Sequence, residues 1–197
     1  MHPNQPTLLT RASPAGVGVE DDVTLARQAR ADPQAFAELY RRHMEPIYRF
    51  HLIRTSDVQD AQDLTSQTFL AALESIESYR GQGSFAGWLF GIASHKVADH
   101  YRRRRTSTPL EAVEDLTDPE PYPEEVAATR LRLSQVARTL ATLPSDQAEA
   151  LTLRLSGGLS ALEVGRIMGR SEAAAKMLVH RGLRNLQDRL ALEPEVA

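Results

Sequence analysis

A segment that suits neither helix nor strand divides the sequence into two parts. Residues 106–129 contain four prolines and seven acidic side chains, but no lysine or arginine. Proline has no amide hydrogen to donate, and like charges repel one another, so both features oppose regular structure in this segment. We therefore expect an acidic flexible linker that joins two modules with basic ends.

On either side of this linker, apolar residues recur with the spacing of α-helices, and no stretch alternates like a half-buried strand. Asp32 and Pro33 have the pattern of a helix start, and Ser160 with Glu163 forms a capping box. One predicted helix carries an apolar stripe with Phe69 beside it, and the stripe consists of Ala61, Leu64, Thr68, Leu73 and Ile76.

The predicted fold class is all-α, with two small helical domains joined by the linker of residues 106–129. Residues 21–105 are expected to form a front helical bundle, and residues 130–192 a back helix-turn-helix domain. Residues 1–20 show little periodicity and are expected to be a disordered extension, while residues 193–197 are a short tail.

The distribution of charge points to nucleic acid, although the net charge of the 197-residue chain is −3. Residues 96–105 carry five basic side chains against one acidic, and residues 165–190 carry six against two. Such local clusters can bind phosphates whatever the total charge is. The sequence has no cysteine, which excludes disulfides, thiolate zinc sites and thiol catalysis. No segment resembles a signal peptide or a membrane span, so a soluble, cytoplasmic protein is expected.

The residues around Gly169 have the pattern of a helix-turn-helix. A short helix ends at this glycine, and Ser171 can cap a longer helix that follows. Within the longer helix, Lys176, His180 and Arg184 are four residues apart and share one outward face. Cations on such a face can reach phosphates and base edges in the major groove of DNA. A helical hairpin with a solvated basic face is the alternative interpretation.

The loop at residues 79–85 has the components of a single-strand DNA site. It begins and ends with an aromatic ring, contains two glycines, and carries amide and hydroxyl side chains. Trp88 follows, and then the basic helix end. Aromatic faces stack on bases, polar groups bind base edges, and a cationic track follows the backbone. Alternatively, Phe85 and Trp88 simply belong to the core.

Two sets of sequence motifs, taken in order, carry a family resemblance. The front set is FAELY at 36–40, DAQDLTSQTF at 60–69, SFAGWLFGIA at 84–93 and DHYRR at 99–103. The back set is LP at 143–144, LRL at 153–155, GLS at 158–160, EVGRIMG at 163–169 and SEAAAKMLVHR at 171–181. Together they resemble a bacterial RNA polymerase sigma factor of the extracytoplasmic-function (ECF) group of the sigma-70 family.

The resemblance implies three contact surfaces. Binding to the clamp coiled coil of core RNA polymerase would use Asp60, Asp63, Leu64, Gln67 and Phe69. Capture and opening of the minus-ten promoter element would use Tyr79, Arg80, Gln82, Ser84, Phe85, Trp88, His95, Lys96, Arg102, Arg103, Arg104 and Arg105. Reading of the minus-thirty-five element would use Arg170, Ser171, Ala174, Lys176, Met177, His180, Arg181 and Arg184.

The sequence also departs from the usual pattern of this family. Ala173, Ala174 and Ala175 stand in place of a Gly-Thr-Val-like run, which removes a hydroxyl that could contact DNA. Met177 and Leu178 replace a common Ser-Arg pair. More of the base readout would then fall to Lys176, His180 and Arg181.

The resemblance implies a sigma factor that binds core RNA polymerase, directs it to promoters and promotes melting of promoter DNA. It implies no catalysis by the chain itself, no cofactor, no metal and no membrane partner, and it suggests an anti-sigma factor as a further partner. A stand-alone helix-turn-helix regulator of duplex DNA is the main alternative. A sigma-like protein that binds polymerase without initiating is another. An enzyme using His95, Asp99 and His100 is a weaker one, because no phosphate-binding loop or HExxH motif accompanies them.

Overall fold

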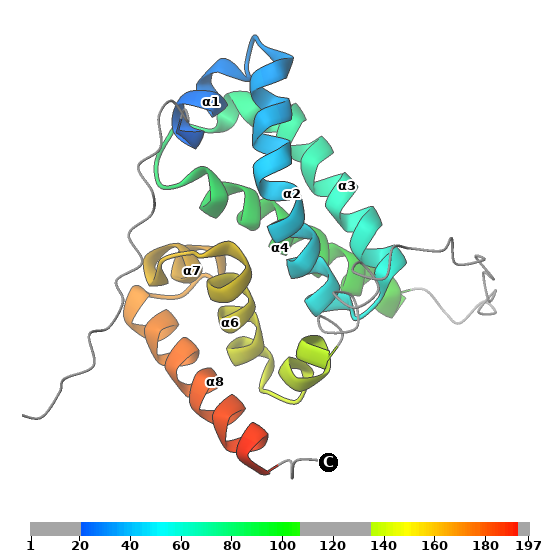
Figure 1. Cartoon of the computed structure of the whole chain (residues 1–197), viewed down its shortest axis with the longest axis vertical. Helices are drawn as coiled ribbons and strands as arrows, with labels where there is room; N and C mark the ends of the chain where they lie inside the picture. The colour runs from blue at the N-terminus through cyan, green and yellow to red at the C-terminus, as the bar shows by residue number, and fades with distance from the viewer. Residues whose placement is uncertain (1–20, 107–134, 193–197) are drawn as a thin grey trace, which may run out of the picture.

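The structure is a computed structural model that describes residues 21–106 and 135–192, and all regular elements in these ranges are helical (Figure 1). The front half contains α1 (Asp22–Gln28), α2 (Pro33–Thr55), α3 (Val58–Ser75), the short 3-10 helix η1 (Ile76–Ser78) and α4 (Phe85–Thr106). The back half contains a helix over residues 135–141, then α6 (Ser145–Gly157), α7 (Ala161–Ile167) and α8 (Glu172–Leu192). The predicted all-α fold is confirmed. The expectations for the disordered extension, the tail and nearly all of the linker lie outside the described residues.

Several helices begin at side chains that cap them. Asp32 accepts a hydrogen bond from the Gln34 amide at 2.8 Å, and Pro33 occupies the first turn of α2, as predicted. The Asp57 carboxylate caps α3 in the same way. The capping box of Ser160 and Glu163 is present at the start of α7. These side chains supply the acceptors that the first amides of a helix lack.

The core of the front half lies between α2, α3 and α4, where Phe50 meets Phe90 edge to face with ring centres 5.4 Å apart. The predicted apolar stripe of α3 is confirmed at Leu64 and Ile76 but wrong at Leu73, which is 47% exposed. Phe69 is buried instead, on the adjoining side of α3. The reason is that α2 and α4 both pack on α3, so its buried face is wider than one stripe and is rotated away from Leu73.

One polar pair, His51 and Thr68, is buried inside this core. The His51 ring is fully buried and its Nε2 lies 3.0 Å from the hydroxyl of Thr68, which also donates to the Leu64 carbonyl. Burial lowers the pKa of His51 to about 3. The imidazole is therefore neutral at physiological pH, as its apolar surroundings require.

The two halves of the chain pack against each other and share one hydrophobic core. α6 lies against α2, and α7 lies against α4 (Figure 1). Leu153, Leu159 and Val164 from the back half are buried in the same cluster as Phe90 from the front half. A Cβ atom on Gly157 would lie 3.0 Å from the Phe90 ring, so a glycine is what lets the end of α6 cross this ring closely. The sequence pattern did not predict this contact.

Candidate nucleic-acid and polymerase interfaces

The helix-turn-helix of the back half is held by a tight crossing of α7 and α8. A Cβ atom on Gly165 would lie 2.8 Å from the Arg170 carbonyl oxygen, so this position accepts only a glycine without rearrangement. Gly169 has a φ of 63° in the turn, and the Arg170 amide donates to the Gly165 carbonyl at 2.8 Å. The hydroxyl of Ser171 then caps α8 through the Ala174 amide. This geometry fixes the direction in which α8 leaves the domain.

The outward face of α8 carries most of the residues that were predicted to read the minus-thirty-five element. The exposed members are Lys176, Met177, His180, Arg181 and Arg184. Ala174 is half-buried, and Ser171 is exposed at the cap. Arg170 pairs with Asp146 of α6 at 2.9 Å, which ties the turn to the rest of the domain. The spacing argument therefore placed the basic face of the second helix correctly.

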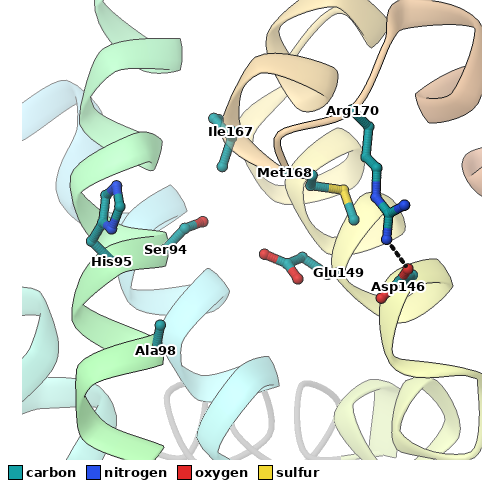
Figure 2. Close-up of a pocket in the computed structure, with 8 residues that line it drawn as sticks. All are labelled: Ser94, His95, Ala98, Asp146, Glu149, Ile167, Met168 and Arg170. Atoms are coloured by element: carbon teal, nitrogen blue, oxygen red, sulfur yellow. Dashed lines mark hydrogen bonds and ion pairs between the residues drawn. The ribbon is translucent and has the colours of Figure 1, made fainter. Parts of the chain in front are cut away.

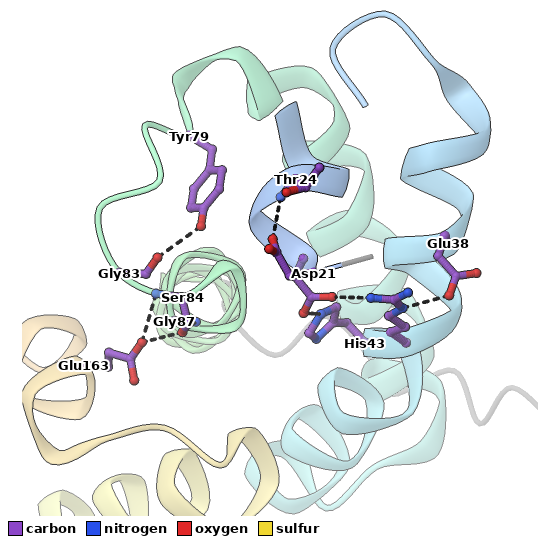
Figure 3. Close-up of polar contacts among 11 residues, drawn as sticks. Asp21, Thr24, Glu38, His43, Tyr79, Gly83, Ser84, Gly87 and Glu163 are labelled. Atoms are coloured by element: carbon purple, nitrogen blue, oxygen red, sulfur yellow. Dashed lines mark hydrogen bonds and ion pairs between the residues drawn. The ribbon is translucent and has the colours of Figure 1, made fainter. Parts of the chain in front are cut away.

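The predicted minus-ten loop is built around three packed rings. Tyr79 and Phe85 are buried, and the half-buried Trp88 lies 5.4 and 5.5 Å from them, measured between ring centres. The Tyr79 hydroxyl donates to the Gly83 carbonyl at 3.1 Å, which closes the loop (Figure 3). Burial raises the pKa of Tyr79, so this hydroxyl stays protonated. Arg80, Gln82 and Ser84 are the exposed polar members of the loop.

A polar network lies behind the loop and joins α1 to α2. The His43 ring lies 5.2 Å from the Phe85 ring and contacts the Asp22 carboxylate at 2.7 Å. Asp22 also accepts from Arg42 at 2.9 Å, and Arg42 binds Glu38 on the same helix (Figure 3). The hydrogen bond from Arg42 lowers the pKa of Glu38. α1 is thereby fixed beneath the aromatic cluster.

Glu163 of α7 reaches across to the front half and binds Ser84 (Figure 3). Its Oε1 accepts from the Ser84 amide at 3.2 Å and from the Ser84 hydroxyl, while its Oε2 accepts from the Ser160 amide and hydroxyl at 2.8 and 2.7 Å. Partial burial acts to raise the pKa of Glu163, but the hydrogen bonds from Ser84 and Ser160 outweigh it and lower the pKa to about 2. This carboxylate was not predicted to contact the loop.

Clefts lie between the halves. A cleft of about 160 Å³ is lined by Gln82, Ser84 and Trp88 from the loop side and by Glu163 and Arg166 from α7. A second cleft, of about 240 Å³, is lined by Ser94 and His95 of α4 and by Asp146 and Glu149 of α6, and Ser94 is on the side of α4 that faces Glu149 (Figure 2). His95, one of the predicted minus-ten residues, therefore lies at the edge of this cleft.

The end of α4 presents the predicted arginine track. Arg102, Arg103, Arg104 and Arg105 are exposed, and Lys96, one of the same predicted set, is half-buried. Arg104 and His100 both approach the Asp60 carboxylate at 3.3 Å, and Asp99 pairs with Arg102. His95, Asp99 and His100 thus have different surroundings, because His95 lines a cleft, Asp99 pairs with an arginine and His100 approaches a carboxylate. In the described parts of the chain, no three metal-ligating side chains are grouped as a metal site.

The predicted polymerase-binding helix divides into an outer and an inner face. Asp63 and Gln67 are exposed, and Asp60 is half-buried between the end of α4 and solvent. Leu64 and Phe69 are buried, and Phe69 packs against Tyr40 with ring centres 4.7 Å apart. The sequence reasoning missed Leu70, which is 57% exposed and lies one turn beyond Gln67 on the outer face. The sequence feature that could have identified Leu70 is that it is an apolar residue outside the predicted core stripe.

Comparison with known proteins matches two family models to separate parts of the chain. The Sigma-70 region 2 family matches residues 39–107, and the Sigma-70, region 4 family matches residues 133–186. None of the helices in the described ranges is long and apolar enough to cross a membrane.

The chain is also similar to individual sigma factors. The ECF RNA polymerase sigma factor BldN of Streptomyces coelicolor is 36% identical over 166 residues, which cover 82% of this chain and 63% of BldN, slightly less than two thirds of that protein. The ECF RNA polymerase sigma factor ShbA of Streptomyces griseus is 33% identical over 132 residues, covering 64% of this chain and 69% of ShbA. The solved structure of CnrH in complex with the cytosolic domain of CnrY covers 88% of this chain and 99% of its own, with 26% identity and a TM-score of 0.65. On sequence and fold together, the chain belongs to the ECF RNA polymerase sigma factors of the sigma-70 family.

Proposed function

We propose that this chain binds core RNA polymerase, directs it to promoters that carry minus-ten and minus-thirty-five elements, and helps to melt the DNA. The observation that carries this proposal is the presence in one chain of two different surfaces that are suited to DNA. α8 offers a basic outward face suited to the major groove, and the front half offers an aromatic-backed loop followed by exposed arginines. A stand-alone helix-turn-helix regulator would need only the first of these surfaces.

In the proposed function, residues 21–105 bind polymerase and the minus-ten element, residues 130–192 bind the minus-thirty-five element, and residues 106–129 join them. Arg80, Gln82 and Ser84 are the loop groups that can reach a base directly. Tyr79 and Phe85 act from beneath, because their buried rings set the shape of the loop. The polymerase supplies the catalytic chemistry, and the chain itself acts as a non-enzymatic initiation factor.

The contact between Glu163 and Ser84 sets a condition on promoter melting. The Ser84 hydroxyl has a single proton, and here it is donated to the Glu163 carboxylate. A base edge can accept that proton only after Glu163 has withdrawn. We infer that the packed arrangement of the two halves precedes capture of the minus-ten element, and that Glu163 leaves Ser84 before the Ser84 hydroxyl donates to a base.

The outer face of α3 is the surface that we assign to polymerase. Asp63, Gln67 and Leu70 are exposed on one side of the helix, and they combine a charge, an amide and an apolar side chain. An apolar residue surrounded by polar ones is typical of the centre of a protein interface.

Two further aspects follow from the likeness to other sigma factors. CnrH has been solved in complex with the cytosolic domain of CnrY, which supports a protein partner for this chain as well, and we propose that this partner is an anti-sigma factor. Action on promoter DNA places the working protein in the bacterial cytoplasm.

Reconstitution tests the proposed function. The full chain is mixed with core polymerase, and complex formation is measured by pull-down. Promoter-dependent transcript formation is then measured on a DNA library. Both should be observed, and an Asp63→Ala variant should lose binding while a Glu45→Ala variant on the exposed side of α2 should not.

The alternatives give different results in the same experiment. Sequence-specific binding to duplex DNA without any polymerase complex would establish the stand-alone regulator instead. A stable polymerase complex that forms no promoter-dependent transcript would establish a sigma-like protein that does not initiate.

A further inference from the structure

The first two turns of α8 present an apolar pair in the middle of its outward polar face. Ala173 and Met177 are both exposed, and Met177 is 50% exposed. They are four residues apart and therefore lie one above the other on the helix surface. Lys176, His180 and Arg184 flank them on the same side. A single exposed apolar residue has no special meaning, but this pair occupies the part of a recognition helix that meets base edges.

The packing of α8 fixes this orientation. Ala175 is buried, and a Cβ atom on Gly182 would lie 2.7 Å from a methyl group of Leu151. Neither Ala175 nor Gly182 could turn outward without opening the contact between α6 and α8. Ala173 and Met177 are therefore held on the exposed side by close packing on the opposite side of the helix.

Two of the charges near the pair are balanced by local partners. Lys176 forms an ion pair with Glu172 at 2.7 Å, one turn earlier on α8. Arg170, in the turn before the helix, pairs with Asp146 at 2.9 Å. The first two turns of α8 thus combine an apolar pair with a neutralised lysine. The exposed Arg181 and Arg184 lie further along, where they can reach phosphates.

The major groove offers one apolar feature, which is the C5-methyl group of thymine. Guanine is usually read by an arginine or lysine that contacts O6 and N7 together, whereas alanine and other apolar side chains contact the thymine methyl. The methionine side chain is unbranched and polarisable, so it can adjust to a methyl group without a fixed geometry.

We propose that Ala173 and Met177 read thymine methyl groups in the minus-thirty-five element, so that thymines replace part of the guanine readout expected from basic residues. This inference rests on the proposed function, because it requires α8 to enter the major groove. Side chains four residues apart on a helix are separated by about 6 Å, and base pairs by about 3.4 Å. The two thymines therefore lie at neighbouring or next-nearest positions.

The test uses the reconstituted holoenzyme and a promoter library with a randomised minus-thirty-five region. The selected element should contain the thymines, and each is then replaced by deoxyuridine, which removes only the methyl group. Loss of one buried methyl contact should weaken binding by about fourfold. A Met177→Gln variant, which keeps the length of the side chain but ends in an amide, should bind the thymine and deoxyuridine duplexes equally at one of the two positions and keep the methyl dependence at the other. Leu183→Ala, which removes an exposed apolar side chain from another side of α8, should keep the full dependence on the methyl group.

Each outcome decides the matter. Equal binding of both duplexes by the unmodified holoenzyme, or a methyl dependence that stays unchanged at both positions in Met177→Gln, would overturn the inference and leave the proposed function intact. Selection of a minus-thirty-five element without thymines would do the same. Failure to form any polymerase complex in the accompanying pull-down would overturn the proposed function and the inference with it.

Discussion

Glu163, near the start of α7, accepts hydrogen bonds from both the backbone amide and the hydroxyl of Ser84, the residue that precedes α4. The same carboxylate completes the capping box of its own helix with Ser160. One side chain therefore serves the N-termini of two helices from opposite halves of the chain. Because the amino end of a helix carries a partial positive charge, this shared position is favourable for a carboxylate.

The Glu163 contact should couple the stabilities of the two halves. We expect Glu163→Ala to lower the free energy of unfolding by about 1–2 kcal/mol, since it removes half of the α7 capping box and the acceptor for the Ser84 amide and hydroxyl. In a double-mutant cycle with Ser84→Ala, the coupling energy should be about 1 kcal/mol, measured by urea denaturation. Glu45→Ala, on the exposed side of α2, serves as the control and should change stability by less than about 0.5 kcal/mol. Additive effects of the two substitutions would show that the contact is absent in solution.

The depressed pKa of Glu163 predicts a loss of stability in acid. The pKa is about 2 in the folded protein against an ordinary value of 4.5, so the unfolded chain takes up the proton first as the pH falls. The contribution of Glu163 is complete above pH 4.5 and is lost between about 4.5 and about 2. The midpoint temperatures of thermal unfolding of the wild type and of Glu163→Gln should therefore converge as the pH falls through this range. Parallel curves down to the lowest pH would contradict the assignment.

His51 predicts a separate effect at higher pH. Burial holds its pKa at about 3 against an ordinary 6.5, so protonation favours the unfolded chain once the pH falls below 6.5. Stability should decline from pH 6.5 toward 3, and the decline above pH 4.5 should be the same in the wild type and Glu163→Gln. Replacing His51 by Gln, which keeps a polar group near Thr68, should remove most of that decline. Thermal unfolding followed by circular dichroism measures it, and an unchanged slope in His51→Gln would count against the prediction.

Features that depend on a few neighbouring residues could be predicted from the sequence. The caps at Asp32 and Ser160 follow from local hydrogen-bonding chemistry, and both are present. The outward placement of Lys176, His180 and Arg184 follows from helical spacing alone. For these features, the packing of distant segments does not change the result.

Features that depend on shape matching between distant segments could not be predicted. Phe90 packs near Gly157 because ring and glycine fit one another, and no local pattern encodes that fit. Leu73 was placed in the core by its spacing, but the neighbours that cover α3 leave it exposed. The aromatic residues of the loop could have been core or stacking surfaces, and only the fold shows Tyr79 and Phe85 inside. Glu163 already has a local role in the capping box with Ser160, so no sequence pattern indicated its second partner, Ser84.

Removing the Glu163 carboxylate should make the minus-ten loop more available. Under the proposed function, Ser84 gives up its contact with Glu163 when it binds a base. Because Glu163→Ala removes this contact of about 1 kcal/mol in advance, the affinity for a single-stranded minus-ten oligonucleotide should rise by about fivefold. We expect this gain in full-length Glu163→Ala, measured by fluorescence anisotropy. Ser160→Ala is the matched control, because it weakens the same capping box but leaves the Ser84 contact in place. An equal gain in both variants would assign the effect to loosening of α7 rather than to Ser84.

The exposed apolar residue of α3 should contribute to polymerase binding. Leu70 is 57% exposed beside Gln67, and burial of such a side chain at an interface commonly contributes about 1–2 kcal/mol. Leu70→Ala should therefore weaken binding to core polymerase by about five- to thirtyfold, without changing the free energy of unfolding appreciably. Leu155→Ala removes a similarly exposed leucine, 60% exposed, from α6 in the back half and is the control. Competition binding against labelled wild-type protein measures both variants. Equal effects of the two substitutions, or none, would mean that polymerase binds a different face of the front half.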